Sequence, residues 1–337
     1  MGSVIPLKKS ANSAYLDLKN HLNGKIENVE KLISLKLQSH VELIKKISDY
    51  HLNSGGKRIR ALLTMGSAKL GGYSNGSRDI NLAACVELIH SATLLHDDVI
   101  DESKVRRGNK TPNSIWGNQS SILVGDYLLS RCFEMMVEDG SLEVLKLLSS
   151  TSSKIAQGEV MQLQYKGEAD LLEDSYIKII NLKTASLFSA ATRVGACIAS
   201  LDEKKKDALE SYGKNLGLAF QIADDALDYF SKEKIFGKEI GKDFFEGKVT
   251  LPIIICFQKA NTIERTFLEN TFKKDERSKE DFENILKLIK KYKSLDSTFR
   301  RAEYFVNVSY DALGIFENSE EKRILQNLTN FSLNRSY

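Results

Sequence analysis

Two groups of aspartates, each spaced Asp-Asp-x-x-Asp, are the residues whose type and spacing most clearly indicate chemistry. The first group is Asp97, Asp98 and Asp101, and the second is Asp224, Asp225 and Asp228. Residues four apart share one face of a helix, so the outer two aspartates of each group point the same way. Neighbouring carboxylates repel one another unless a cation neutralises them, and Mg²⁺ prefers such hard oxygen ligands. We therefore expect the two groups to form opposite walls of one multi-Mg²⁺ site.

Basic side chains that could hold phosphate occur in four short segments. They are Lys57, Arg58 and Arg60 after a Gly-Gly pair, then Arg106 and Arg107, then Lys183, and finally Lys238, Lys242 and Lys248. Arginine suits bidentate phosphate contacts and lysine suits point-charge contacts. Carboxylates on one side and cations on the other favour a polyphosphate substrate bridged by metal. Neither a Walker loop nor a Rossmann glycine motif is present, so a nucleotide enzyme has no positive support.

Composition indicates the kind of scaffold that carries these residues. Of the 337 residues, 42% are hydrophobic and only 3 are proline, which favours long uninterrupted helices. The net charge of +3 gives no reason to expect nucleic acid as a partner. The four cysteines are far apart and favour reduced, buried thiols. With no apolar run of about 18–20 residues and no signal peptide, we expect a soluble, cytoplasmic protein that could touch a membrane peripherally.

Apolar periodicity predicts a chain that is helical nearly throughout. Helical patterns cover 24–50, 59–70, 80–102, 118–138, 141–166, 173–200, 203–231 and 251–259. Loops are expected at 74–78, 103–112 and 237–248, with a charged connector at 273–281. No paired strands and no internal repeat are evident. The sequence therefore predicts an all-α, single-domain helical bundle over 1–337, with the aspartate groups on apolar helices.

Several motifs together resemble the trans-isoprenyl diphosphate synthases, the polyprenyl synthetase family. They are GGKRIR at 55–60, LLHDDVIDESKVRRG at 94–108, GEVMQLQ at 158–164, KTASLF at 183–188, FQIADDALDY at 220–229 and GKEIGKDFFEGKVTLP at 237–252. The resemblance covers a catalytic core of about residues 30–335 and is strongest to the long-chain bacterial branch, the octaprenyl diphosphate synthases. It implies an isoprenoid synthase bundle with a central active-site cavity, and a homodimer. Ala61 stands where the family usually has proline, which should matter little for catalysis.

The resemblance also implies a role for each candidate site residue. Two to three Mg²⁺ per active site are expected on Asp97, Asp98, Asp101, Asp224, Asp225 and Asp228. The residues expected to be catalytic are Asp97, Asp101, Lys183 and Asp224. An allylic diphosphate, expected to be farnesyl diphosphate, contacts Arg106, Lys183, Thr184, Gln221, Lys238 and Lys248. Isopentenyl diphosphate contacts Lys57, Arg60, His90 and Arg107; His90 taken alone could equally be a core histidine.

Product length is expected to follow from the residues just before the first aspartate group. Ala92 and Thr93 are small, and Ile89 lies one turn further back, so a growing tail can pass. The helix before Asp101 offers about 30 Å to run along, enough for roughly six to ten isoprene units. We expect an all-trans octaprenyl product, of use as a quinone side chain in ubiquinone biosynthesis. A shorter geranylgeranyl or hexaprenyl product is the alternative.

Three other functions are less consistent with the sequence. A terpene cyclase uses one diphosphate, whereas this chain carries a second Asp-Asp-x-x-Asp group and cations for a second diphosphate. A non-catalytic partner subunit usually lacks one aspartate group, and both are intact here. A helical interaction module leaves the paired charge clusters unexplained.

Overall fold

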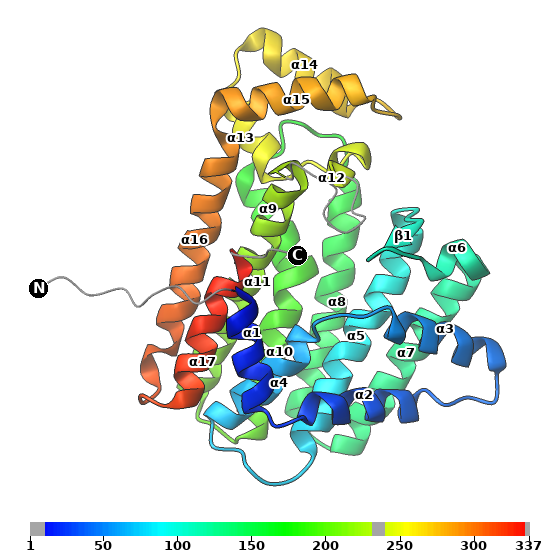
Figure 1. Ribbon diagram of the computed structural model, residues 1–337, viewed down its shortest axis with the longest axis vertical. Coiled ribbons are helices and arrows are strands. Elements are labelled where there is room, and N and C mark those ends of the chain that lie inside the picture. The colour runs from blue at the N-terminus through cyan, green and yellow to red at the C-terminus, as the bar shows by residue number, and fades with distance from the viewer. Residues whose placement is uncertain (1–10, 231–239, 334–337) are drawn as a thin grey trace, which may run out of the picture.

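The computed structural model describes residues 11–230 and 240–333, which fold into helices of very different length (Figure 1). The first half contains α1 Ala11–His21, α2 Lys25–Lys36, α3 Glu42–Asn53, α4 Ile59–Leu70, α5 Arg78–Ile100, α6 Pro112–Trp116, α7 Asn118–Asp139 and α8 Leu142–Gln164. The second half contains α9 Glu173–Ile180, the π-helix η1 Asn181–Ala185, α10 Ser186–Ile198, α11 Glu203–Phe230, α12 Lys242–Phe245, α13 Leu251–Lys259, α14 Thr262–Phe272, α15 Lys279–Tyr292, α16 Ser294–Ala312 and α17 Glu320–Thr329. Short 3₁₀ turns, η2 Leu313–Ile315 and η3 Asn330–Ser332, complete the list.

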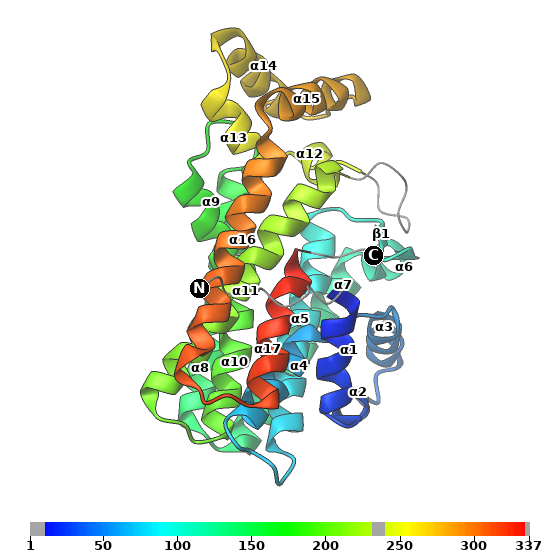
Figure 2. The same ribbon diagram turned by 60° about the vertical axis from the view of Figure 1, so that its left-hand side comes forward.

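The long helices α5, α7, α8, α10, α11 and α16 run along the long axis of the molecule (Figure 1). In Figures 1 and 2, α14 and α15 lie across one end, above α13 and α16. Helix α10 packs between α4 and α11, and α5 packs against α4 and α7. The aspartate groups therefore sit on α5 and α11, two helices that form the inside of the bundle.

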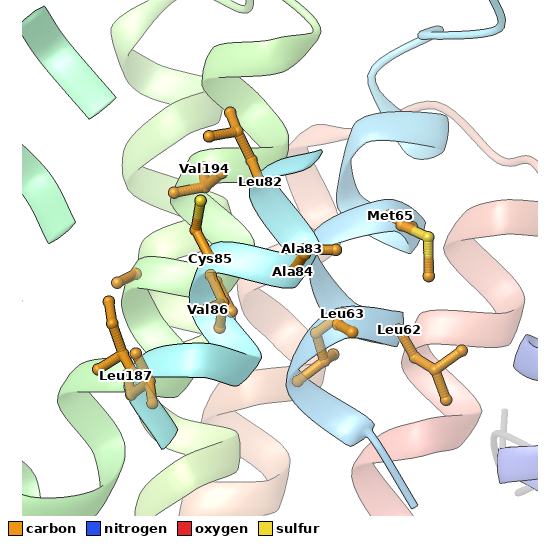
Figure 3. Packing of buried hydrophobic residues seen from close by; sticks show 14 of the residues in the cluster. Leu62, Leu63, Met65, Leu82, Ala83, Ala84, Cys85, Val86, Leu187 and Val194 are labelled. Carbon is orange, nitrogen blue, oxygen red and sulfur yellow. The ribbon is translucent and has the colours of Figure 1, made fainter. Parts of the chain in front are cut away.

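The core consists of two clusters of buried apolar side chains. The larger involves α4, α5 and α10 and includes Leu62, Val86, Leu187 and Val194, which are labelled in Figure 3. The smaller lies around α9, α13 and the end of α11 that carries the second aspartate group. Both clusters include residues of α11, which runs without a break for 28 residues, about 42 Å. Helix α11 thus gives rigid support to both sides of the expected site.

The structure confirms the all-α fold class and most of the expected helices. The ranges 59–70 and 251–259 coincide with α4 and α13. The continuous pattern over 24–50 is wrong, because the chain breaks between α2 and α3, where the Ser39 hydroxyl accepts a hydrogen bond from the Val41 amide. Serine favours such local bonds over helix continuation. The expected loop 237–248 also contains a short helix, α12.

The absence of paired strands was also a wrong expectation, though only for one small hairpin. Strand β1 Val105–Arg106 pairs antiparallel with β2 Asn109–Lys110. The turn between them is Arg107-Gly108, and both residues have positive φ, 53° and 80°. Two positive φ values are what a two-residue hairpin turn requires, and arginine is an unusual residue for the first position. The hairpin presents Arg106 and Arg107 at fixed positions beside the end of α5.

Candidate active site

Residues from both aspartate groups line a single cavity of about 210 Å³. Asp101 comes from the end of α5, and Asp224 and Asp225 come from α11. Lys183 and Lys248 line the same space, so cations and carboxylates share it. A larger hollow of about 470 Å³ lies between α1 and α17 and contains neither aspartate group. The smaller cavity is therefore the candidate active site.

The three aspartates of the first group have three different environments. Asp98 is fully buried, and its Oδ1 accepts from Nε and Nη2 of Arg106, each at 2.8 Å. Asp101 accepts a hydrogen bond from Nζ of Lys248 at 2.8 Å. Burial alone would raise the pKa of Asp101, but the charge of Lys248 outweighs that effect, and the pKa lies below its ordinary value. Burial, despite Lys183, raises the pKa of Asp97 to about 6, with Glu159 and Asp101 adding to the rise. Added positive charge beside Asp97 would therefore favour its ionised form.

In the second group, the carboxylates of Asp225 and Asp228 are engaged by neighbouring groups. Asp225 accepts from the Tyr176 hydroxyl at 2.6 Å and from Nε2 of Gln221 at 2.8 Å. Burial, with Asp243 close by, raises the pKa of Asp225 well above its ordinary value. Asp228 accepts from the backbone amides of residues 242 and 243, at 3.2 and 2.9 Å, and so holds the start of α12. Among the three, Asp224 and Asp225 line the cavity.

Lys183 lies in η1, one turn of π-helix between α9 and α10. Its Nζ is 2.5 Å from Glu159 and 2.8 Å from Oε1 of Gln162, both on α8. The next residue, Thr184, donates to Oε1 of Gln221 at 2.9 Å. A π-turn changes the direction of the side chains that follow it and is frequent at functional sites. Here it brings Lys183 and Thr184 together into the cavity.

Two glycines allow the neighbouring helices to approach η1 closely. A Cβ at Gly158 of α8 would lie 2.6 Å from the backbone nitrogen of Lys183. A Cβ at Gly217 of α11 would lie 2.7 Å from Cα of Ala185. Both distances are shorter than real side chains allow, and backbone atoms cannot move aside cheaply. Glycine at these two positions therefore allows the close helix packing that positions Lys183 and Thr184.

Gly158→Ala is accordingly expected to displace η1 and to lower both stability and activity. Overpacking of this kind costs about 1–3 kcal/mol, and misplacement of a charged group by about 1 Å can cost 10²-fold in rate. Thermal melting and steady-state kinetics measure the two effects. Gly314→Ala is the matched control, because a Cβ there meets nothing within 4 Å. Equal kinetics for the two variants would contradict this view of η1.

A second cluster of cations forms where the Gly55-Gly56 loop meets the β1–β2 hairpin. Arg107 donates from Nη1 to the carbonyl of Gly55, and Arg60 is buried with its guanidinium 4.4 Å from the ring centre of Phe188. Burial, then Arg60 and Arg107, lower the pKa of His90 far below its ordinary value. His90 is thus a neutral imidazole in a positive environment. Nζ of Lys57 lies 4.8 Å from the ring centre of Phe331.

Each of the other sequence-predicted residues has a definite place except Lys238. Lys238 lies outside the described residues. Arg106, Thr184, Gln221 and Lys248 all line the cavity. The three expected chain-length residues do not line it: Ile89 and Ala92 are buried in the larger core cluster, and Thr93 is half-buried.

Comparison with known proteins decides the family. The polyprenyl synthetase family model matches residues 41–289, about three quarters of the chain. The chain belongs to the polyprenyl synthetase family. It is 36% identical to octaprenyl diphosphate synthase of Haemophilus influenzae over 93% of this chain and 94% of that protein. Its identity to the octaprenyl diphosphate synthase of Escherichia coli is 37%, over 91% of this chain and 94% of that protein.

A solved structure of this family confirms the fold. The chain resembles a polyprenyl synthase from Caulobacter crescentus, solved with calcium and isoprenyl diphosphate, with a TM-score of 0.92 and 39% identity over 99% of this chain and all of that one. The isoprenoid synthase bundle is thus confirmed, and the chain is a long-chain trans-polyprenyl diphosphate synthase, a prenyltransferase. Within the described residues, no helix is both long and apolar enough to span a membrane.

The cavity of this polyprenyl synthetase fits divalent cations in its donor chemistry. Asp101, Asp224, Asp225, Asp243 and Glu246 give its lining hard carboxylate oxygens. Besides burial, the neighbouring carboxylates Asp243 and Asp224 raise the pKa of Asp225. Among residues 11–230 and 240–333, no three His, Cys, Asp or Glu side chains converge as a ready-made metal cage. Mg²⁺ usually takes one or two protein carboxylates and completes its octahedron with water and substrate phosphate.

Sequence reasoning gave no role to several residues of this site. Glu159 and Gln162 pair with Lys183, Tyr176 donates to Asp225, and Asp243 and Glu246 line the cavity. Glu159 and Gln162 are three apart in GEVMQLQ, a spacing that puts both on one helical face. The position of Tyr176 is harder to predict from the sequence. The π-turn that contains Lys183 breaks the regular helical period, so the period does not show that Tyr176 and Lys183 face the same cavity.

Proposed function

We propose that this polyprenyl synthetase adds isopentenyl diphosphate repeatedly to an allylic diphosphate, with farnesyl diphosphate as primer. One observation carries the proposal: Asp101 of the first aspartate group and Asp224 and Asp225 of the second line a single cavity together with Lys183 and Lys248. Such a cavity suits a diphosphate that is held from two sides. The separate cations around His90 suit the second diphosphate.

Divalent cations belong to this proposal, as two to three Mg²⁺ held by Asp97, Asp101 and Asp224. Mg²⁺ supplies Lewis-acid neutralisation of the departing diphosphate. Asp98 and Asp228 already have protein partners. Arg106 donates to Asp98, and the backbone amide of Lys242 at the start of α12 donates to Asp228. Asp98, Asp225 and Asp228 therefore support the site mainly by keeping its other parts in position.

The basic residues of the cavity are proposed to stabilise charge that develops during reaction. When the C1–O bond of the allylic substrate breaks, its electron pair leaves with the diphosphate. Arg106, Lys183 and Lys248 line the cavity and place positive charge beside that growing negative charge. The double bond of isopentenyl diphosphate then bonds to C1, and loss of a proton from its C2 to the departed diphosphate restores a double bond.

The apolar part of the lining is proposed to protect the allylic cation from water. Leu171, Ile179, Ile180 and Val249 face the cavity beside the carboxylates. Water would trap the cation as an alcohol, so its exclusion is necessary for chain growth. Isopentenyl diphosphate is proposed to bind where Arg60, His90 and Arg107 come together. Lys57 adds a further cation at the edge of this region.

The experiment that tests this function is incubation with farnesyl diphosphate, isopentenyl diphosphate and Mg²⁺. The products are dephosphorylated and separated by chromatography, and we expect a ladder ending at about eight isoprene units. Conversion of farnesyl diphosphate alone to cyclic hydrocarbons would favour a terpene cyclase. Absence of any elongation would refute the proposal.

Thr93→Phe is expected to shorten the product. Thr93 is half-buried one helical turn before Asp97, about 6 Å along α5, and does not itself line the cavity. The growing tail is proposed to extend from the cavity along this face of α5, where a phenyl ring would block it. We expect the product to fall to about four isoprene units or fewer. Leu94→Phe is the control, because Leu94 lies about 100° further round α5. An unchanged product length for Thr93→Phe would contradict the steric proposal.

The homodimer, the cytoplasmic location and the peripheral membrane contact remain parts of this proposal, as does supply of a quinone side chain. The dimer has physical support in two neighbouring helices with exposed apolar side chains. These are Leu123, Phe133 and Val137 on α7 and Leu142, Val160 and Leu163 on α8. A second copy covering this surface would remove it from water. Sedimentation of the purified chain measures the oligomeric state.

A further inference from the structure

Tyr176 joins α9 to the second aspartate group through one hydrogen bond. Its side chain is only 2% exposed, yet it is among the residues that line the catalytic cavity. The hydroxyl donates to Oδ2 of Asp225 at 2.6 Å. A tyrosine hydroxyl is protonated at neutral pH, so toward a carboxylate it acts as a donor. Bonds of this charge-assisted kind are short and about twice as strong as neutral ones.

The same carboxylate is held from its other side. Oδ1 of Asp225 accepts from Nε2 of Gln221 at 2.8 Å, and Oε1 of Gln221 accepts from Thr184 at 2.9 Å. The four side chains therefore form one chain of hydrogen bonds across α9, α11 and η1. Each carboxylate oxygen of Asp225 thus accepts one hydrogen bond, which fixes the orientation of the carboxylate. Asp224 is the residue just before Asp225 on α11. The orientation of the second aspartate group thus depends on side chains from α9, α11 and η1.

We propose that Tyr176 is a positioning residue, whose hydroxyl holds Asp225 so that the second aspartate group is preorganised for a divalent cation bridging to diphosphate. This inference rests on the proposed function. Without the hydroxyl, Asp225 Oδ2 keeps its burial but loses this donor, which favours rotation of the carboxylate. A rotated Asp225 carboxylate must turn back to its original orientation before metal and diphosphate can bind. Loss of the hydroxyl should therefore raise the Mg²⁺ concentration that the enzyme requires more than it lowers the rate of the chemical step.

Tyr176→Phe removes the hydroxyl and keeps the ring. Loss of a partner that orients metal ligands typically costs about 10–100-fold in metal affinity. We expect the Mg²⁺ concentration for half-maximal activity to rise by about 10-fold, with most of kcat recovered at saturating Mg²⁺. Tyr212→Phe is the matched control, because Tyr212 is fully buried on α11 and donates to the carbonyl of Leu325 at 2.8 Å. It should lose stability and keep the Mg²⁺ requirement of the unaltered chain.

A binding measurement separates this inference from the proposed function. The melting temperature of each protein is followed while Mg²⁺ is titrated in the presence of inorganic diphosphate, with no turnover. We expect the Mg²⁺ midpoint of Tyr176→Phe to lie about 10-fold above those of the unaltered chain and Tyr212→Phe. A midpoint within about twofold of the unaltered chain would overturn the role of Tyr176. Mg²⁺-dependent stabilisation of the unaltered chain without any elongation would instead refute the proposed function.

Two further variants keep the inference testable if Tyr176→Phe folds poorly. Gln221→Met removes the donor to the other oxygen of Asp225 and is expected to raise the midpoint in the same direction. In an Asp225→Ala background, Tyr176→Phe should cause no additional shift, because the carboxylate through which it acts is gone. An undiminished shift in that background would show that Tyr176 acts on something other than Asp225.

Discussion

Asp97→Asn is expected to lower kcat by roughly 10³-fold, the largest loss among the single substitutions considered. Asp97 and Asp101 lie four apart at the end of α5, and Lys248 already engages Asp101. Burial and the carboxylates of Glu159 and Asp101 raise the pKa of Asp97, so a nearby cation would favour its ionised form. Asparagine keeps the shape and removes the charge that a metal ion needs. Steady-state kinetics at saturating Mg²⁺ measures the loss.

The same substitution is expected to raise the melting temperature of the metal-free protein near pH 7. Burial raises the pKa of Asp97 to about 6, so ionised Asp97 destabilises the fold. This cost is fully present above about pH 6 and disappears below the ordinary value of 3.8, where the group is protonated in both the folded and unfolded chain. The gain in melting temperature should therefore shrink as pH falls from about 7 to about 4.

Asp174→Asn is the control for both effects, because Asp174 is exposed in the first turn of α9. It should leave kcat and the melting temperature nearly unchanged. If Asp97→Asn lowered the melting temperature at neutral pH and kept most of kcat, Asp97 would be a structural residue.

Lys183→Gln is expected to lower kcat by roughly 10²-fold, because it removes a fixed positive charge from the cavity. It also leaves Glu159, 8% exposed, without its partner at 2.5 Å. Breaking a buried pair from one side costs about 3–5 kcal/mol, and the partial exposure of Lys183 places this case at or below the lower end. The variant should therefore be both slow and less stable.

The double variant Glu159→Gln/Lys183→Gln separates those two consequences. Removing both charges should restore most of the melting temperature and none of the lost kcat. Lys178→Gln, at an exposed position on α9, is the control for loss of one positive charge. Recovery of kcat in the double variant would mean that Lys183 only neutralises Glu159 and has no direct part in the reaction.

The sequence alone predicts the helices and the main charged groups because both depend on local pattern. The 3.6-residue period locates α4, α5, α11 and α13 closely, since few prolines interrupt it. The spacing of the aspartates likewise shows which carboxylates share a helical face. Family resemblance then supplies the fold and the class of reaction, both of which the comparisons confirm.

Other features of the site depend on tertiary contacts that no local pattern encodes. The π-turn of η1 lies against α8 and α11, which approach it closely at Gly158 and Gly217. Asp228 looks equivalent to Asp101 in sequence, yet it accepts backbone amides at the start of α12. The sharp hairpin at Arg107 was missed because arginine rarely takes a positive φ. Each of these requires knowing what lies beside the residue in space.

The two aspartate groups are proposed to act on one diphosphate through divalent cations. Crystals grown with Mn²⁺ and inorganic diphosphate test this proposal through the anomalous signal of manganese. We expect metal positions beside Asp97 and Asp101 and beside Asp224, all bound to the same diphosphate. Metal at only one group, or a diphosphate bound without metal contacts to both groups, would contradict the claim.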